Sequence, residues 1–208
     1  MNTSSQSPPG TAAERLLDAA VVVFAREGIS KATTREIAKE AGVNEVTLFR
    51  NFQTKQGLLA AVLERAFLPT LAGDANEPEG KAVKLEEAVR AFATEDFERK
   101  RRNIALMRVL VGESHRLGEH ESAILARIFH PWKERLANRL REARSKGLIR
   151  QEVDPAMVVD QLVAMTFVGA LRAEKSGVMG YPPEKYLNAS IDLILHGILV
   201  RRPKRTSK

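Results

Sequence analysis

Apolar residues recur along most of the chain with the three- and four-residue spacing of α-helices. The first run follows Thr11, and Glu14 stands three residues after that threonine, which is the pattern of a helix-starting capping box. Gly28 comes after the last apolar position and is typical of a helix end. The run itself lies on one helical face: Leu16, Leu17, Ala20, Val23 and Phe24.

Three short helices are predicted next. A second capping box begins at Thr33, and Gly42 ends the helix that it opens. Asn44 can cap a third helix that runs to about Phe52. Thr54 can cap a fourth helix, and the composition of residues 71–80 predicts a loop after it.

The rest of the chain continues the helical pattern. Predicted helices lie near residues 81–98, 102–117, 119–146, 154–175 and 183–200. Aromatic residues make up only 5% of the chain, and good helix formers are abundant, so the fold class predicted is all-α with about nine helices. The predicted organisation is a disordered leader (1–10), a helix-turn-helix domain (11–56), a larger helical domain (57–200) and a basic tail (201–208).

Composition excludes several kinds of chemistry. The chain has no cysteine, so it has neither a disulfide framework nor a cysteine-ligated metal or cysteine nucleophile. His115 and His120 are poorly spaced for a metal site, and no paired carboxylates, Ser/His/Asp set or phosphate-binding glycine loop stands out. We therefore expect no metal, no cofactor and no enzyme activity. The uncharged stretch from Gln161 to Leu171 is shorter than the ~20 residues that span a bilayer, so no membrane partner is expected.

The net charge of +7 is unevenly distributed. Residues 1–66 have eight basic and seven acidic groups, a difference of only +1, and the other +6 lies beyond them. Net charge therefore does not mark the first domain as a DNA-binding region, and geometry has to supply that argument.

The geometry comes from residues 33–52, where two capped helices are joined by a short turn. Ala38 is small where two helices would cross, and Gly42 accepts a positive φ without steric cost. This is the pattern of a helix-turn-helix, whose second helix enters the major groove. An ordinary helical hairpin has the same pattern. The outward positions of the second helix would be Asn44, Glu45, Thr47, Phe49, Arg50 and Asn51.

Residues 14–64 resemble the N-terminal domain of TetR-family transcriptional regulators. The resemblance extends in register through four helices and includes residues 14–20, 24–28, 32–38, 41–43 and 47–49, with Phe52, Thr54 and Lys55. The remainder resembles the family only in length and helix count. The resemblance implies a DNA-binding N-terminal domain and a C-terminal domain that binds a small ligand and forms the dimer.

The resemblance also implies residue roles. Thr34 and Arg35 would meet the DNA backbone and groove edge, and residues 45–47 would read bases. Phe49 stands where the family usually has a phosphate-binding tyrosine, Asn51 where histidine or tyrosine is common, and Lys55 where a lysine contacts phosphate. The predicted DNA-binding residues are Thr33, Thr34, Arg35, Asn44, Glu45, Val46, Thr47, Phe49, Arg50, Asn51 and Lys55.

The last two helices, about 155–175 and 183–200, are expected to form a homodimer, with Ala164, Gly169, Ala170 and Gly197 allowing close approach. They could also be the centre of a monomer. A ligand pocket is expected within residues 81–180, although large apolar residues at helical spacing are usually core. The candidate ligand-binding residues are Phe92, Met107, His115, Phe129, Trp132, Met165 and Phe167.

The function implied is that of a cytoplasmic, ligand-responsive regulator that binds a near-palindromic operator as a dimer. As a repressor, it would be released by a small apolar or aromatic effector that shifts the fourth helix. The family also includes activators, so the resemblance leaves the sign of regulation open. The alternative is a helical small-molecule-binding dimer that no longer reads DNA specifically, which Glu45, Phe49 and the weak +1 charge favour.

Overall fold

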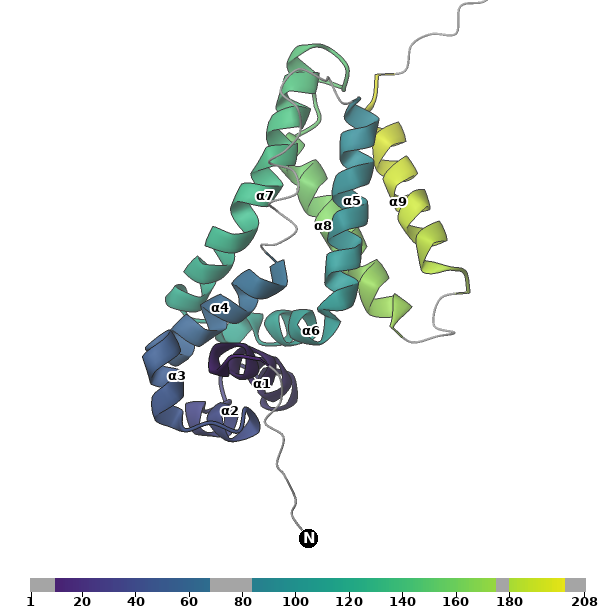
Figure 1. Ribbon diagram of the computed structural model, residues 1–208. Helices are drawn as coiled ribbons and strands as arrows, with labels where there is room; N and C mark the ends of the chain where they lie inside the picture. Colours follow the sequence, from purple (N-terminus) through teal and green to yellow (C-terminus); the bar gives the residue numbers. More distant parts are fainter. Residues whose placement is uncertain (1–9, 68–83, 175–179, 201–208) are drawn as a thin grey trace, which may run out of the picture. The chain divides into compact units, whose positions relative to one another are not determined.

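The computed structural model describes residues 10–67, 84–174 and 180–200 (Figure 1). Within these ranges the regular structure is helical, apart from an isolated bridge between Ile149 and Leu199, so the predicted all-α class is confirmed. The predicted loop at residues 71–80, the basic tail and the leader apart from Gly10 lie outside the described residues. The helices are α1 (Ala12–Glu27), α2 (Thr34–Glu40), α3 (Glu45–Phe52), α4 (Lys55–Phe67), α5 (Leu85–Arg102), α6 (Ile104–Gly112), the 3-10 helix η3 (Ser114–Arg116), α7 (Glu119–Ser145), α8 (Pro155–Ala173) and α9 (Pro183–Ile198).

The predicted helix starts are confirmed by their hydrogen bonds. Thr11 and Thr33 each accept the backbone N–H three residues on, and the glutamate at that position accepts the threonine's own N–H. Asp154 accepts two backbone N–H groups at the start of α8, where Pro155 needs no partner for its nitrogen. Residues within three positions of each boundary therefore specify where these helices begin.

One predicted helix is divided in two. The segment expected at 102–117 consists of α6 and η3, and α5 extends to Arg102, beyond its predicted end. Asn103 separates α5 from α6, because its side-chain amide donates to the Arg99 carbonyl at 2.9 Å and closes the last turn of α5. The basic end of α5 also suits the negative end of the helix dipole.

The chain contacts group into two compact units. The first comprises residues 1–69 and 105–128, so the helix-turn-helix segment shares a unit with most of α6, η3 and the start of α7. In this unit α1 packs against α2, α3 and α4. Its fully buried side chains include Leu16, Phe24, Ile37, Leu48 and Leu58. The grouping differs from the linear division that the sequence suggests at residues 56 and 57.

The second unit comprises residues 70–104 and 129–208. Here α5 packs against α8 and α9, α8 packs against α9, and the later part of α7 adds Trp132, Leu136 and Leu140 to the same hydrophobic core. Gly169 lies inside this unit, since an added Cβ would come within 2.6 Å of Tyr186 on α9. Gly169 and the buried Ala170 therefore allow close packing within the chain, not against a partner as the sequence suggested.

Helix α8 is long and apolar enough, by length and composition, to cross a membrane, which differs from the sequence-based expectation. The sequence-based expectation counted only the uncharged stretch between Asp160 and Arg172. The whole helix has 19 residues and includes both of these charged residues. The packing of α8 on α5 and α9 is that of a core helix, and a single such helix is weak evidence for a membrane span.

Candidate functional site

The turn between α2 and α3 is closed by backbone hydrogen bonds. Val43 N–H donates to the Ala38 carbonyl at 3.0 Å and Gly42 N–H to the Lys39 carbonyl at 3.1 Å, while Gly42 has a φ of 63°. These two bonds and the left-handed glycine form a Schellman motif. Asn44 then accepts the Val46 N–H at 2.9 Å and starts α3 directly after the turn. Local chemistry thus fixes the short connection that a helix-turn-helix requires.

Helix α3 is anchored by one residue and exposes most of the others. Leu48 is fully buried, whereas the side chain of Val46 is 72% exposed and that of Phe49 is 45% exposed. Arg50 and Asn51 are exposed as well. An eight-residue helix whose outer face combines apolar, cationic and amide groups can contact thymine methyls, phosphates and base edges.

Several predicted DNA-binding side chains already have partners within the first unit. The Thr34 hydroxyl donates to the Glu45 carboxylate at 2.6 Å, which joins α2 to the start of α3. The Asn51 amide donates to the Thr47 carbonyl at 2.7 Å. Thr33 caps α2, so its hydroxyl is engaged with Glu36. Arg35 is the cation of α2 that was predicted to contact DNA, and its side chain is exposed.

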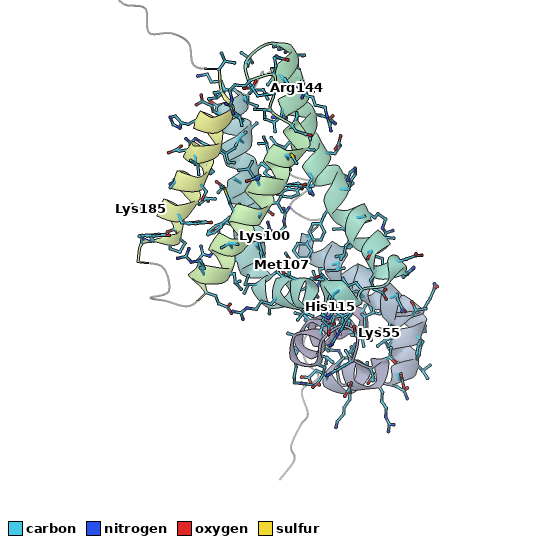
Figure 2. All side chains as sticks on the ribbon, turned by 180° about the vertical axis from the view of Figure 1, so that it is seen from behind. Lys55, Lys100, Met107, His115, Arg144 and Lys185 are labelled. Atoms are coloured by element: carbon cyan, nitrogen blue, oxygen red, sulfur yellow. The ribbon has the colours of Figure 1, made fainter. Side chains whose placement is uncertain are left out.

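Lys55 begins α4, as predicted, but it is only partly exposed. Its ammonium donates to the Ser30 carbonyl at 3.1 Å, and burial lowers the pKa of Lys55, opposed by the nearby carboxylates of Glu113 and Glu121. Glu113 itself accepts the Ser30 N–H at 3.0 Å. Figure 2 shows Lys55 among the helices of the first unit, where a cavity of about 250 Å³ is lined by Ile29, Ser30, Lys55, Gln56, Leu59, Arg116, Leu117 and Glu121.

Comparison with known proteins gives the family. Residues 16–62 match the family model described as "Bacterial regulatory proteins, tetR family", and residues 82–176 match "Tetracyclin repressor-like, C-terminal domain". The nucleoid occlusion factor SlmA of Marinobacter nauticus is 31% identical over 148 residues, covering 68% of this chain and 71% of SlmA. The chain belongs to the TetR family.

Two further proteins show which parts of the chain resemble other family members in sequence and which in fold. The uncharacterized HTH-type transcriptional regulator YvkB of Bacillus subtilis is 48% identical over 52 residues, which cover 25% of this chain and 28% of YvkB. The structure of FadR from Bacillus subtilis in complex with stearoyl-CoA aligns with a TM-score of 0.72 at 19% identity, covering 89% of this chain and 98% of FadR. The TetR-family likeness is therefore strongest in sequence at the N-terminal end and extends along the chain in fold.

The family match shows the general functional class of the protein. TetR-family proteins are transcriptional regulators and not enzymes. The first family match covers α1 to α4 as far as Val62, which includes every predicted DNA-binding residue. Within the described residues, no group of three or more His, Asp or Glu side chains could hold a metal ion.

The seven candidate ligand-binding residues are divided between the two units. Met107 and the exposed His115 belong to the first unit, and the other five to the second. Of those five, Phe92 and Trp132 lie together, with ring centroids 4.0 Å apart and planes 13° apart, and both line a cavity of about 90 Å³. Phe129, Met165 and Phe167 line neither this cavity nor the one beside Lys55.

Sequence reasoning missed a buried polar cluster behind Trp132. Asp96, Arg99, Lys100 and Thr166 are each at most 4% exposed. Arg99 donates to Asp96 at 2.8 Å. Lys100, labelled in Figure 2, donates to Asp96, to Thr166 at 2.8 Å and to the Val163 carbonyl at 2.7 Å. Burial lowers the pKa of Lys100, opposed by Asp96.

The helical face on which this cluster lies could be predicted from the sequence. Asp96 and Arg99 follow Phe92 by four and seven residues, which places them on its helical face. The sequence does not show which residues of other helices would pair with these charges, because Thr166 is seventy residues away from Asp96.

Proposed function

We propose that this chain is a cytoplasmic transcriptional repressor that binds a near-palindromic operator as a homodimer and is released by a small-molecule effector. The observation that carries the proposal is the outer face of α3, where Val46 and Phe49 are exposed beside Arg50. Val46 and Phe49 are three residues apart, so they share one face of α3, and thymine methyls in the major groove can cover such an apolar pair.

The proposed reading surface comprises the eleven predicted residues, with unequal roles. Arg35 and Arg50 are exposed cations suited to phosphates or guanine. Glu45, tied to Thr34, supplies discrimination by repelling phosphates and accepting from cytosine. Lys55 is half-buried and already donates one of its three N–H groups to the Ser30 carbonyl, so we propose a smaller contribution than its position in the motif implies.

The dimer is proposed to form through α8 and α9. Exposed apolar side chains on these helices include Met157, Val168 and Leu193, and Ala164 and Gly197 are exposed and small. A single helix-turn-helix contacts one half-site, so a dimer is needed to hold two reading helices about 34–36 Å apart.

An effector bound in the second unit is proposed to release the DNA. The FadR relative, whose structure holds stearoyl-CoA, supports ligand binding by this fold. To shift the protein from 1:99 to 99:1 between its DNA-binding and released states, the effector must bind the released state about 5.5 kcal/mol more tightly.

Selection of bound duplexes from a random DNA pool tests the proposal. We expect an inverted repeat with half-sites about one helical turn apart, and affinity that falls steeply with salt. Arg50→Ala should reduce the salt slope by about one if Arg50 contacts one phosphate. Arg90→Ala, which removes a cation of α5 paired with Asp192, is the matched control and should leave the slope unchanged. Enrichment of no sequence would favour the small-molecule-binding dimer that does not read DNA.

A further inference from the structure

The cavity beside Lys55, which is labelled in Figure 2, lies wholly within the first unit. Its lining comes from the turn after α1, the start of α4, the end of η3 and the first turn of α7. The apolar part of the lining consists of Ile29, Leu59 and Leu117. The volume of about 250 Å³ is several times the ~30 Å³ share of one water molecule, so the cavity has room for a small organic molecule.

The charged groups of the lining have bonding capacity that the chain does not use. Lys55 donates one of its three N–H groups to the Ser30 carbonyl at 3.1 Å, which leaves two. In the described part of the chain, the side chains of Arg116 and Glu121 form no hydrogen bond or ion pair with another residue. Arg116 is exposed, and Lys55 and Glu121 are half-buried.

Opposite charges therefore line one cavity without contacting each other. Among the described residues, no ion pair joins Glu121 to Lys55 or to Arg116. Glu113, the other carboxylate that acts on Lys55, does not line the cavity and accepts the N–H and hydroxyl of Ser30 at 3.0 and 3.3 Å. Burial lowers the pKa of Lys55, so its ammonium is partly desolvated and an anion in contact with it would stabilise its charge.

We propose that this cavity binds a zwitterionic α-amino acid with an apolar side chain. The ligand carboxylate accepts from Lys55 and Arg116 in charge-assisted hydrogen bonds, and the ligand ammonium donates to Glu121. The ligand side chain lies against the apolar part of the lining. A ligand with only one of the two charges leaves the opposite group of the wall desolvated without a partner, which costs affinity.

This inference goes beyond the proposed function, because it adds a small-molecule site to the unit that contains α3. The effector of the proposed function binds in the other unit. The new site does not depend on that effector or on DNA binding.

Isothermal titration calorimetry of the full-length protein without DNA tests the inference. L-Leucine is the probe. Isocaproate, which is leucine without its ammonium, and isoamylamine, which is leucine without its carboxylate, are the comparison probes. We expect saturable binding of leucine with a dissociation constant about tenfold or more below those of both comparison probes.

Two substitutions should change the affinities in a crossed pattern. Arg116→Gln should weaken the binding of leucine and isocaproate but not of isoamylamine, because it removes a cation. Glu121→Gln should weaken the binding of leucine and isoamylamine but not of isocaproate, because it removes the carboxylate. General damage to the fold would weaken the binding of all three probes in both variants.

Arg127→Gln is the matched control for loss of a cation. Arg127 lies on α7 in the same unit, outside the cavity lining, and pairs with Glu64 at 2.7 Å. This variant should bind leucine as wild type does.

Absent or non-saturable leucine binding would overturn the inference, and so would either comparison probe binding as tightly as leucine. Leucine binding that is unchanged in both Arg116→Gln and Glu121→Gln would place the amino acid elsewhere and also overturn it. Because the titration contains no DNA, each of these results is independent of the duplex selection. The proposed DNA-binding function can therefore fail while this site stands, or the reverse.

Discussion

Gly28 shows what single residues contribute to the first unit. Its φ of 85° and ψ of 159° lie in a region that is essentially restricted to glycine. An added Cβ would also come within 2.3 Å of a Glu113 carboxylate oxygen, and that carboxylate accepts the N–H and hydroxyl of Ser30. One glycine therefore both ends α1 and admits the side chain that fixes the segment after it.

We expect Gly28→Ala to lower the free energy of unfolding by about 1–3 kcal/mol, because it strains the backbone. It also displaces Glu113 from Ser30. Gly42→Ala is the matched comparison, since Gly42 has a φ of 63° but open space around its Cβ position, and it should cost less. Urea unfolding of the full chain measures both. Equal losses of unfolding free energy in the two variants would show that displacing Glu113 does not contribute to the loss.

Glu45→Gln should tighten binding to unrelated DNA and narrow the ratio between operator and scrambled DNA. Removing the carboxylate charge reduces repulsion by phosphates and weakens acceptance from cytosine. Titrations against both duplexes measure the effect. Thr34→Val is a useful companion, because it removes the hydroxyl that donates to Glu45 at 2.6 Å and leaves the charge. Unchanged affinity for both duplexes in Glu45→Gln would contradict the role proposed for this carboxylate.

At the scale of elements, the N-terminal helices depend on their caps. Helix α2 has only seven residues and α3 eight, which is too short for either to persist alone in water. Thr33 and Asn44 supply acceptors for the free N–H groups at their starts. These caps could be predicted because the residues that form them are three apart or closer in the sequence.

The two capping boxes make part of the stability depend on pH. Hydrogen bonds from the Thr11 backbone and hydroxyl lower the pKa of Glu14, and those from the Thr33 hydroxyl and backbone lower the pKa of Glu36. The folded state therefore binds fewer protons than the unfolded state near these pKa values. This stabilisation is present above the ordinary glutamate pKa and is lost as pH falls through the lowered one.

The double variant Glu14→Gln and Glu36→Gln should lose less stability than wild type between about pH 5 and pH 3. Glutamine can still accept in a capping box but does not titrate there. Urea unfolding across this range is the measurement. Thr33→Ala serves as a contrast, because it removes the cap at every pH and should cost about 1 kcal/mol even at pH 7. A double variant with the same pH dependence as wild type would show that other carboxylates dominate.

For the whole molecule, the proposed dimer depends on an exposed apolar surface of α9. Leu193 is 66% exposed on α9, beside Tyr186, Ala189 and Ser190 in a shallow apolar hollow. A carboxylate at this position would lose its hydration in the proposed dimer, which destabilises the interface.

Leu193→Glu should convert the protein from dimer to monomer at micromolar concentration and weaken operator binding at least tenfold. Sedimentation equilibrium gives the mass, and titration with the selected duplex gives the affinity. Val22→Glu is the matched control, since Val22 is 48% exposed on α1 in the other unit and should leave the mass unchanged. A dimeric Leu193→Glu protein would exclude this face of α9 from the interface.

The sequence alone determined the helical class, the caps, the turn at Gly42 and the family resemblance of residues 14–64, because each depends on neighbours within a few positions. Tertiary structure decided which side chains are buried. Lys100 is buried because α8 supplies the Thr166 hydroxyl and the Val163 carbonyl from more than sixty residues away, and Arg99 is buried between Asp96 and the Trp132 ring of α7. Lys55 is tied to Ser30, and Phe92 meets Trp132, for the same reason: burial and charge pairing depend on contacts that only folding brings together.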